Sequence, residues 1–124
     1  MLRLHHVNLG VPVGGADAEE DFLLDVLGYR RVPTPPELAT KFARQARWFA
    51  SEDGKQIHLS EDPDHRPAAR AHVAVEVDDE LPAFVERLER AGIEHASFDG
   101  GGLHVVFCQD PAGNRWELRG GAPA

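Results

Sequence analysis

The chain has 124 residues and a net charge of −8 at pH 7, and its only cysteine is Cys108. This charge argues against a nucleic-acid binder and against binding to an anionic membrane, because both partners need a basic surface. No apolar run approaches the roughly 20 residues that span a bilayer, and a lone cysteine fits a reducing compartment, so we expect a cytoplasmic protein.

The chain opens with a predicted strand and helix. Alternating side chains predict a strand over residues 2–11, which ends at Pro12. Asp17 and Glu20 resemble a capping box at the start of the helix, and Gly28 is a suitable C-terminal cap. We expect the acidic face of this helix, which includes Glu19, to be solvated.

Three short strands complete the first half. Residues 29–32 predict a strand that stops at a proline-rich segment, and residues 47–51 and 56–60 predict a hairpin across a glycine turn. Residues 37–46 are either a helical turn or a loop over a pocket, and their length does not decide between the two. The Pro-, Asp- and Arg-rich residues 61–70 predict a polar linker.

The same order then repeats. A strand over 71–77 precedes a helix that Asp78 or Asp79 caps and that ends near Gly92. A strand over 93–97, a glycine-rich loop over 99–102 and a hairpin of 103–109 with 115–119 follow. We therefore predict a single domain over residues 1–124, made of module 1–60 and module 71–120. Neither module could bury its apolar face well alone.

Two pairs of segments support this internal repeat. Ser51-Glu52-Asp53-Gly54-Lys55-Gln56-Ile57-His58-Leu59 resembles Asp110-Pro111-Ala112-Gly113-Asn114-Arg115-Trp116-Glu117-Leu118, in which turn residues lead into an alternating strand. Similarly, His6-Val7-Asn8-Leu9-Gly10-Val11 resembles His72-Val73-Ala74-Val75-Glu76-Val77. The repeat therefore relates His58 to Glu117 and His6 to His72.

These four residues are the candidate metal ligands. Each lies on the strand face opposite the aliphatic side chains, which must pack under the helices, so all four should point to the other, concave face. Three imidazoles and one carboxylate suit Zn²⁺, Fe²⁺, Co²⁺, Ni²⁺ or Mn²⁺, and the pattern does not select one of them. The predicted ligands are His6, His58, His72 and Glu117.

Four segments together resemble the vicinal oxygen chelate superfamily, which includes glyoxalase I, bleomycin and fosfomycin resistance proteins and extradiol dioxygenases. They span nearly the whole chain: His6-Val7-Asn8-Leu9-Gly10-Val11, Phe22-Leu23-Leu24-Asp25-Val26-Leu27-Gly28-Tyr29, His72-Val73-Ala74-Val75 and the stretch from Asp110 to Leu118. The resemblance implies an α+β fold in which two βαβββ modules form a curved, cup-shaped mixed sheet with the helices outside.

In metal-dependent members of the superfamily the metal ligands come from the first and last strand of each module. In this chain the resemblance implies His6, His58, His72 and Glu117, which are the same four residues. Metal-dependent members of the superfamily bind substrate oxygens to the ion, which acts as a Lewis acid. This chain departs from the pattern, because glyoxalase I has a carboxylate at the position of His58, and methylmalonyl-CoA epimerase, another member of the superfamily, has a glutamine there. Glu117 would then be both metal ligand and catalytic base, and the two-carboxylate glyoxalase mechanism is in doubt.

Two classes of function remain open. The first is a metal-dependent lyase, isomerase or dioxygenase that acts on a small molecule through vicinal oxygens. The second is a metal-free protein that sequesters a small molecule, as in the bleomycin resistance branch. The resemblance favours a homodimer, in which the modules pair within one chain or across two. The substrate and the role of residues 33–46 do not follow from the sequence.

Several other residues have simpler readings. His5 is the fallback ligand if the strand register is shifted by one residue. His104 may line the cup without a chemical role, and Cys108 is expected to be a buried, inert thiol. At least two of Trp48, Phe49 and Phe107 are expected in the core. Arg44 and Arg47 are expected on the solvated surface.

Overall fold

The computed structural model describes residues 1–37 and 47–121. The chain divides into two compact units, Met1–Arg66 and Pro67–Ala124, each built around its own four-stranded sheet. Most of the segment 37–46, together with Arg44, lies outside the described residues.

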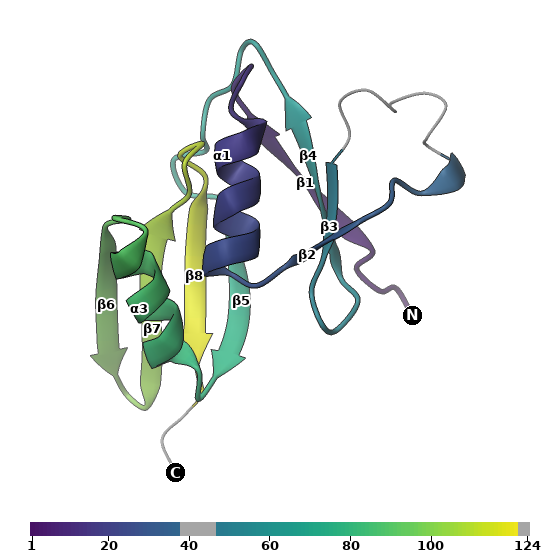
Figure 1. Cartoon of the computed structure of the whole chain (residues 1–124). Coiled ribbons are helices and arrows are strands. Elements are labelled where there is room, and N and C mark those ends of the chain that lie inside the picture. The colour runs from purple at the N-terminus through teal and green to yellow at the C-terminus, as the bar shows by residue number, and fades with distance from the viewer. Residues whose placement is uncertain (38–46, 122–124) are drawn as a thin grey trace. The chain divides into compact units, whose positions relative to one another are not determined.

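The first unit has the order strand, helix, three strands. Its elements are β1 (His6–Val11), α1 (Ala16–Asp21), the π-helical turn η1 (Phe22–Val26), β2 (Arg30–Val32), β3 (Arg47–Ala50) and β4 (Gln56–Glu61). The sheet order is β1-β4-β3-β2, with β1 parallel to β4 and the other pairs antiparallel (Figure 1).

The second unit repeats this plan. Its elements are β5 (His72–Asp78), α3 (Leu81–Arg90), β6 (His95–Gly100), β7 (Leu103–Gln109) and β8 (Arg115–Gly120). The sheet order is β5-β8-β7-β6, and only the β5–β8 pair is parallel. The predicted α+β class with two βαβββ modules is therefore confirmed.

Each unit buries large apolar side chains on its sheet. In the first unit Phe49 and Leu59 are almost inaccessible, and in the second Trp116 and Leu118 are. Trp48 is also buried, while Phe107 remains 36% exposed. The expectation that two of the three aromatic residues lie in the core is confirmed.

The predicted N-terminal helix caps are wrong. Gly15 and Glu80 occupy the N-cap positions of α1 and α3, and neither helix has a side-chain cap hydrogen bond. Asp17 is the second residue of α1, and Asp78 and Asp79 precede Leu81, the first residue of α3, by three and two residues. Gly28 and Gly92 do end their helices, with φ of 80° and 71°, where a side chain would strain the backbone.

Two further expectations need correction. Glu19 was expected on the solvated face of α1, but its side chain is buried. The loop predicted over residues 99–102 is shorter, because β6 continues to Gly100 and pairs with β7. Gly101 and Gly102 both have positive φ, which is what a two-residue hairpin turn requires, so pairing continues up to the turn itself.

The turn before β8 is held by one buried carboxylate. Asp110 is 4% exposed, and its Oδ1 accepts hydrogen bonds from the backbone N–H groups of Ala112 at 3.1 Å and Asn114 at 2.8 Å. Its Oδ2 accepts from Trp116 Nε1 at 2.9 Å. The predicted turn chemistry therefore extends into the core and fixes the start of the strand that carries Glu117.

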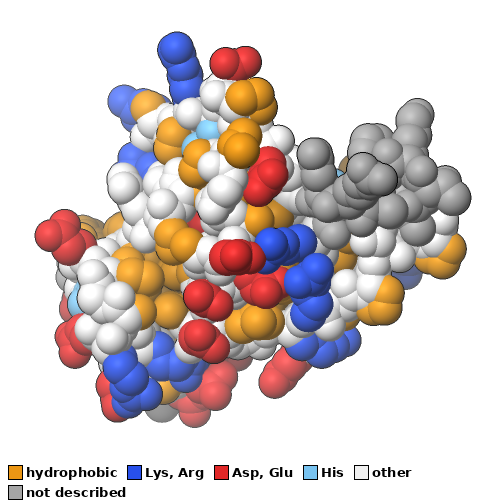
Figure 2. Space-filling view, turned by 45° about the horizontal axis from the view of Figure 1, so that its top comes forward, with side chains coloured by type: hydrophobic (Ala, Val, Ile, Leu, Met, Phe, Trp, Pro, Cys, Tyr) orange, Lys and Arg blue, Asp and Glu red, His pale blue; other side chains and the backbone are white. Residues whose placement is uncertain are grey.

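Acidic and basic side chains are interspersed on the face drawn in Figure 2. Arg47, for example, pairs with Asp17 at 2.7 Å and lies 3.7 Å from Glu20, so it is an ion-paired residue near the surface. No helix among the described residues has the length and apolar character needed to cross a membrane.

Candidate functional site

The two predicted ligands of the first unit lie on one face of its sheet. His6 pairs with Gln56 across the β1–β4 ladder, and His58 lies two residues further along β4. Residues two apart in a strand share a face, so both imidazoles project from the same side. Their ring centroids are 6.4 Å apart. This register places His6, rather than His5, on the face of His58.

Trp48 packs between these two histidines. Its ring stacks on His58 at 4.6 Å with an interplanar angle of 4°, and the His6 ring meets it edge-on at 4.7 Å. Burial, with a smaller contribution from the charge of His6, lowers the pKa of His58. His58 is therefore neutral at pH 7, and neutral imidazole is the form that binds metal ions.

Two buried polar atoms on this face lack a hydrogen-bond partner within the described part of the chain. They are Trp48 Nε1, a donor, and Gln56 Oε1, an acceptor. Trp48 is paired with His58 across β3 and β4, and Gln56 precedes His58 by two residues, so both share the histidine face. Because buried polar groups are normally satisfied, an ordered water or a polar group of a bound molecule is the partner expected at these two atoms.

The second unit brings His72 and Glu117 together in the same way. His72 pairs with Arg115 across the β5–β8 ladder, and Glu117 lies two residues further along β8. His72 Nε2 lies 3.8 Å from Glu117 Oε1. The His6–His58 and His72–Glu117 pairs therefore occupy equivalent positions: each joins the first residue of a parallel strand to the third residue of its partner.

A backbone contact sets the tautomer of His72. Its Nδ1 lies 2.9 Å from the carbonyl oxygen of Arg70. A carbonyl oxygen can only accept, so Nδ1 must carry the proton, and the lone pair lies on Nε2, the atom that faces Glu117. A hydrogen bond of this kind orients metal-binding histidines in proteins. Nothing in the sequence pattern would have revealed it, because the partner is a main-chain atom.

The donor atoms of the second unit fit a divalent ion. Two donors that share an ion at about 2.0–2.2 Å lie about 3–4 Å apart, and the His72–Glu117 distance falls in this range. Two neighbouring imidazoles on one ion have centroids roughly 4.5–5.5 Å apart at these bond lengths, so the 6.4 Å between the His6 and His58 rings is wider than a shared ion requires. No three His, Cys, Asp or Glu side chains among residues 1–37 and 47–121 come together as a metal cluster.

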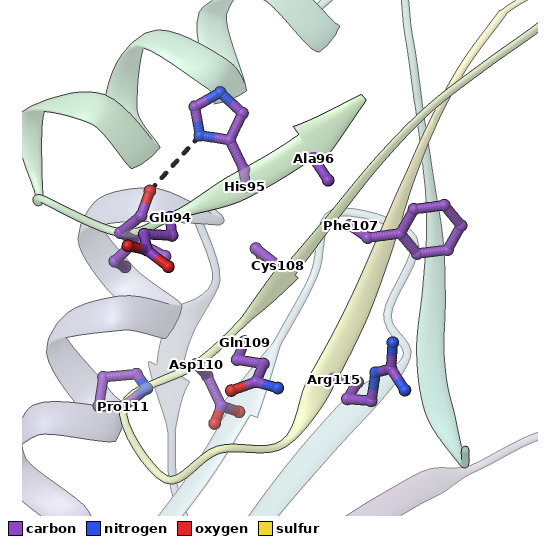
Figure 3. Close-up of a pocket in the computed structure, with 10 residues that line it drawn as sticks. Glu94, His95, Ala96, Phe107, Cys108, Gln109, Asp110, Pro111 and Arg115 are labelled. Carbon is purple, nitrogen blue, oxygen red and sulfur yellow. Dashed lines mark hydrogen bonds between the residues drawn. The ribbon is translucent and has the colours of Figure 1, made fainter. Parts of the chain in front are cut away.

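Two cavities lie within the second unit, and neither is lined by His72 or Glu117. The cavity of about 590 Å³ in Figure 3 lies beside β6 and β7, where His95 and Cys108 are opposite each other in the ladder. The other, of about 950 Å³, contains His104, whose Nδ1 lies 2.5 Å from Asp99 Oδ1. His104 shares a face with Leu118 rather than with Glu117, so the expectation that it lines the cup is wrong.

Cys108 is a buried thiol, as expected. Burial, with a smaller contribution from the charge of Asp110, raises its pKa to about 11. At pH 8 the thiolate, which is the reactive form, is then about 100-fold scarcer than for an ordinary cysteine thiol.

In the folded protein we expect alkylation of Cys108 by iodoacetamide at pH 8 to be at least about 100-fold slower than alkylation of free cysteine. Unfolding in urea should restore the ordinary rate, and a folded-state rate close to that of free cysteine would show that the thiol is accessible and ionised.

The fold and these two ligand-type pairs define a two-module α+β protein with candidate metal ligands on the first and last strand of each module. Residues 3–118 match the Glyoxalase/Bleomycin resistance protein/Dioxygenase superfamily, and the chain belongs to this superfamily. The predicted resemblance is thereby confirmed. The comparison with curated proteins gives no match.

Solved structures share the fold over nearly the full chain. A glyoxalase family protein from Bacillus anthracis has 28% identity and a TM-score of 0.82, with 98% of this chain and 96% of that chain covered. A glyoxalase/dioxygenase from Nostoc punctiforme has 23% identity, a TM-score of 0.83 and coverage of 98% and 92%. The E126Q mutant of the fosfomycin resistance protein FosX from Listeria monocytogenes, complexed with Mn(II) and 1S,2S-dihydroxypropylphosphonic acid, has 18% identity, a TM-score of 0.78 and coverage of 98% and 91%.

Proposed function

We propose that this protein is a divalent-metal-dependent enzyme that acts on a small molecule with vicinal oxygen atoms, as a lyase, isomerase or dioxygenase. The main observation behind the proposal is that His6 with His58, and His72 with Glu117, occupy equivalent positions in the two modules. In each pair the first residue of one parallel strand lies beside the third residue of its partner strand. Within each pair the two side chains project from the same face of the sheet, so both can face a common ligand. The Mn(II) complex of FosX, a protein of the same fold, supports the choice of a divalent ion.

Each of these residues has a proposed role in binding or catalysis. The three histidines and Glu117 would hold the ion, which when bound supplies Lewis-acid activation of substrate oxygens. Glu117 is the only carboxylate among the four, so it is also the proposed base. Its side chain is 13% exposed, which limits competition from water for a transferred proton. Trp48 Nε1 and Gln56 Oε1 offer a donor and an acceptor to a polar substrate.

The metal content of untagged protein purified without chelator is the first test. We expect about one divalent ion per chain by plasma mass spectrometry, because four donors of this type bind such ions tightly. Iron would direct assays to dioxygen consumption, whereas zinc, nickel or cobalt would direct them to lyase and isomerase substrates. Protein that stays empty after reconstitution with each candidate ion would rule out the metal site.

One observation favours a second candidate, a metal-free binding protein. Phe98 and Phe107 lie on the face of β6 and β7 that carries Glu117, and they are 55% and 36% exposed. Exposed aromatic side chains on one sheet face are suited to contact a planar ligand. If no ion binds, quenching of tryptophan fluorescence by small aromatic ligands becomes the appropriate screen.

We also propose that the protein is a cytoplasmic homodimer. A dimer would allow the modules to pair either within one chain or across two chains, and two equivalent sites would result. Light scattering on a size-exclusion column measures the mass of the assembly against 13.6 kDa for one chain. A monomer that still binds one ion would show that a single chain is enough to form the metal site.

A further inference from the structure

The two oxygens of the Glu117 carboxylate have different partners. Oε1 lies 3.8 Å from His72 Nε2, on the side of the proposed ion. Oε2 accepts a hydrogen bond from Arg119 Nη1 at 2.8 Å. The carboxylate is largely buried, with 13% of its side chain exposed, whereas the Arg119 side chain is 40% exposed. One oxygen is thus available for a ligand, and a charged donor occupies the other.

The strand explains why Arg119 reaches this oxygen. Residues 117 and 119 share a face of β8, so the guanidinium lies beside the carboxylate. Arg115 flanks Glu117 at the same spacing on the other side, but its Nη1 donates to the carbonyl oxygen of Ala69 at 2.6 Å. Of the two flanking arginines, Arg119 is therefore the one that contacts the carboxylate.

We propose that Arg119 is a positioning residue that restricts Glu117 to one-oxygen coordination of the metal ion. This inference rests on the proposed metal site. A carboxylate can bind an ion through one oxygen or through both, and the second mode would require Oε2 to leave its charge-assisted hydrogen bond with the guanidinium. By holding Oε2, Arg119 preserves a coordination position that a substrate oxygen needs.

The arrangement matters for a substrate that binds through two oxygens. Such a substrate requires two exchangeable positions on the ion, and a four-residue ligand set with a two-oxygen carboxylate would fill one of them. Arg119 contributes little to folding stability, since a half-exposed ion pair is screened by water. Its substitution should therefore change the coordination of the ion without unfolding the protein.

The test counts water molecules on bound Mn²⁺ by water-proton relaxation. In Arg119→Met we expect lower relaxivity per bound ion than in the wild type, because the released Oε2 takes a position that water holds. Arg115→Met, which removes an arginine at the same spacing from the same face, should leave the relaxivity unchanged. Arg119→Lys, which keeps one charged donor, should restore the wild-type value.

A second variant covers the case in which methionine at this position disturbs the fold. Arg119→Ala should show the same reduced relaxivity, and millimolar guanidinium should raise it again by occupying the vacated space beside Oε2. Unchanged relaxivity in both Arg119 variants, with Mn²⁺ bound, would overturn the role of Arg119. Failure of the wild type to bind Mn²⁺ or any other divalent ion would instead overturn the proposed metal site, so the two failures are distinguishable.

Discussion

We expect replacement of His72 by alanine to abolish measurable binding of a divalent ion and to leave the fold intact. His72 is the first residue of β5, its side chain is 41% exposed, and it contacts Glu117 and the carbonyl of Arg70 rather than the core. Loss of a second-shell partner typically lowers metal affinity by about 10–100-fold, and loss of a direct ligand should cost more. Isothermal titration with Mn²⁺ or Zn²⁺ measures the affinity, and circular dichroism reports the fold.

His95 provides a closely matched control for this substitution. It is the first residue of β6, its Nδ1 lies 3.4 Å from the carbonyl oxygen of Ile93, and its Nε2 lies 3.8 Å from Glu89 Oε1. The local surroundings thus resemble those of His72, but His95 is outside the predicted ligand set. His95→Ala should bind the ion with wild-type affinity. Unchanged binding in His72→Ala, with a native spectrum, would remove His72 from the site.

Replacement of Asp110 by alanine should have the largest effect on stability. The substitution leaves two backbone N–H groups and the buried indole N–H of Trp116 without their acceptor. A hydrogen bond to a charged group contributes about 1.5–3 kcal/mol, so we expect the loss of these bonds to lower the free energy of unfolding by about 3–5 kcal/mol. Urea unfolding at pH 7 measures this loss. The urea concentration at the midpoint of unfolding should fall, whereas the dependence of the free energy of unfolding on urea concentration should not change.

The two oxygens of Asp110 can be separated by further variants. Asp110→Asn keeps an oxygen for the backbone N–H groups but presents an NH₂ group to Trp116 Nε1, so it should be less destabilising than alanine. Trp116→Phe removes the indole donor, and in that background Asp110→Asn should cost little more. If the losses in free energy of unfolding from Asp110→Asn and Trp116→Phe simply add in the double variant, the Asp110–Trp116 hydrogen bond is not the cause of the destabilisation.

Most of the fold was predictable because its signals are local. Alternation of polar and apolar residues located the strands, and Gly28 and Gly92 located the helix ends. The face of each candidate ligand was also predictable, since a strand has a period of two and the aliphatic face must be buried. This rule places His6 with His58 and His72 with Glu117.

The remaining features depend on tertiary contacts that local pattern does not contain. Glu19 follows the pattern of a solvated helix face but is buried, and the partner of His72 Nδ1 is a main-chain carbonyl. His104 was expected to line the cup, but the pairing of β7 with β8 places it on the face of Leu118, opposite Glu117. The contact between Arg119 and Glu117 could have been anticipated, since residues two apart in a strand share a face.

The parallel pairs have a consequence for how the protein folds. In each unit the last strand to be synthesised, β4 or β8, lies inside its sheet, between the first strand and the remaining hairpin. The first strand therefore has no neighbour in its sheet until the chain has closed a loop of about 40–50 residues, and such non-local pairing is slow. During synthesis β1 must wait for residues 56–61 and β5 for residues 115–120, so each pair of candidate ligands forms only when its module is complete.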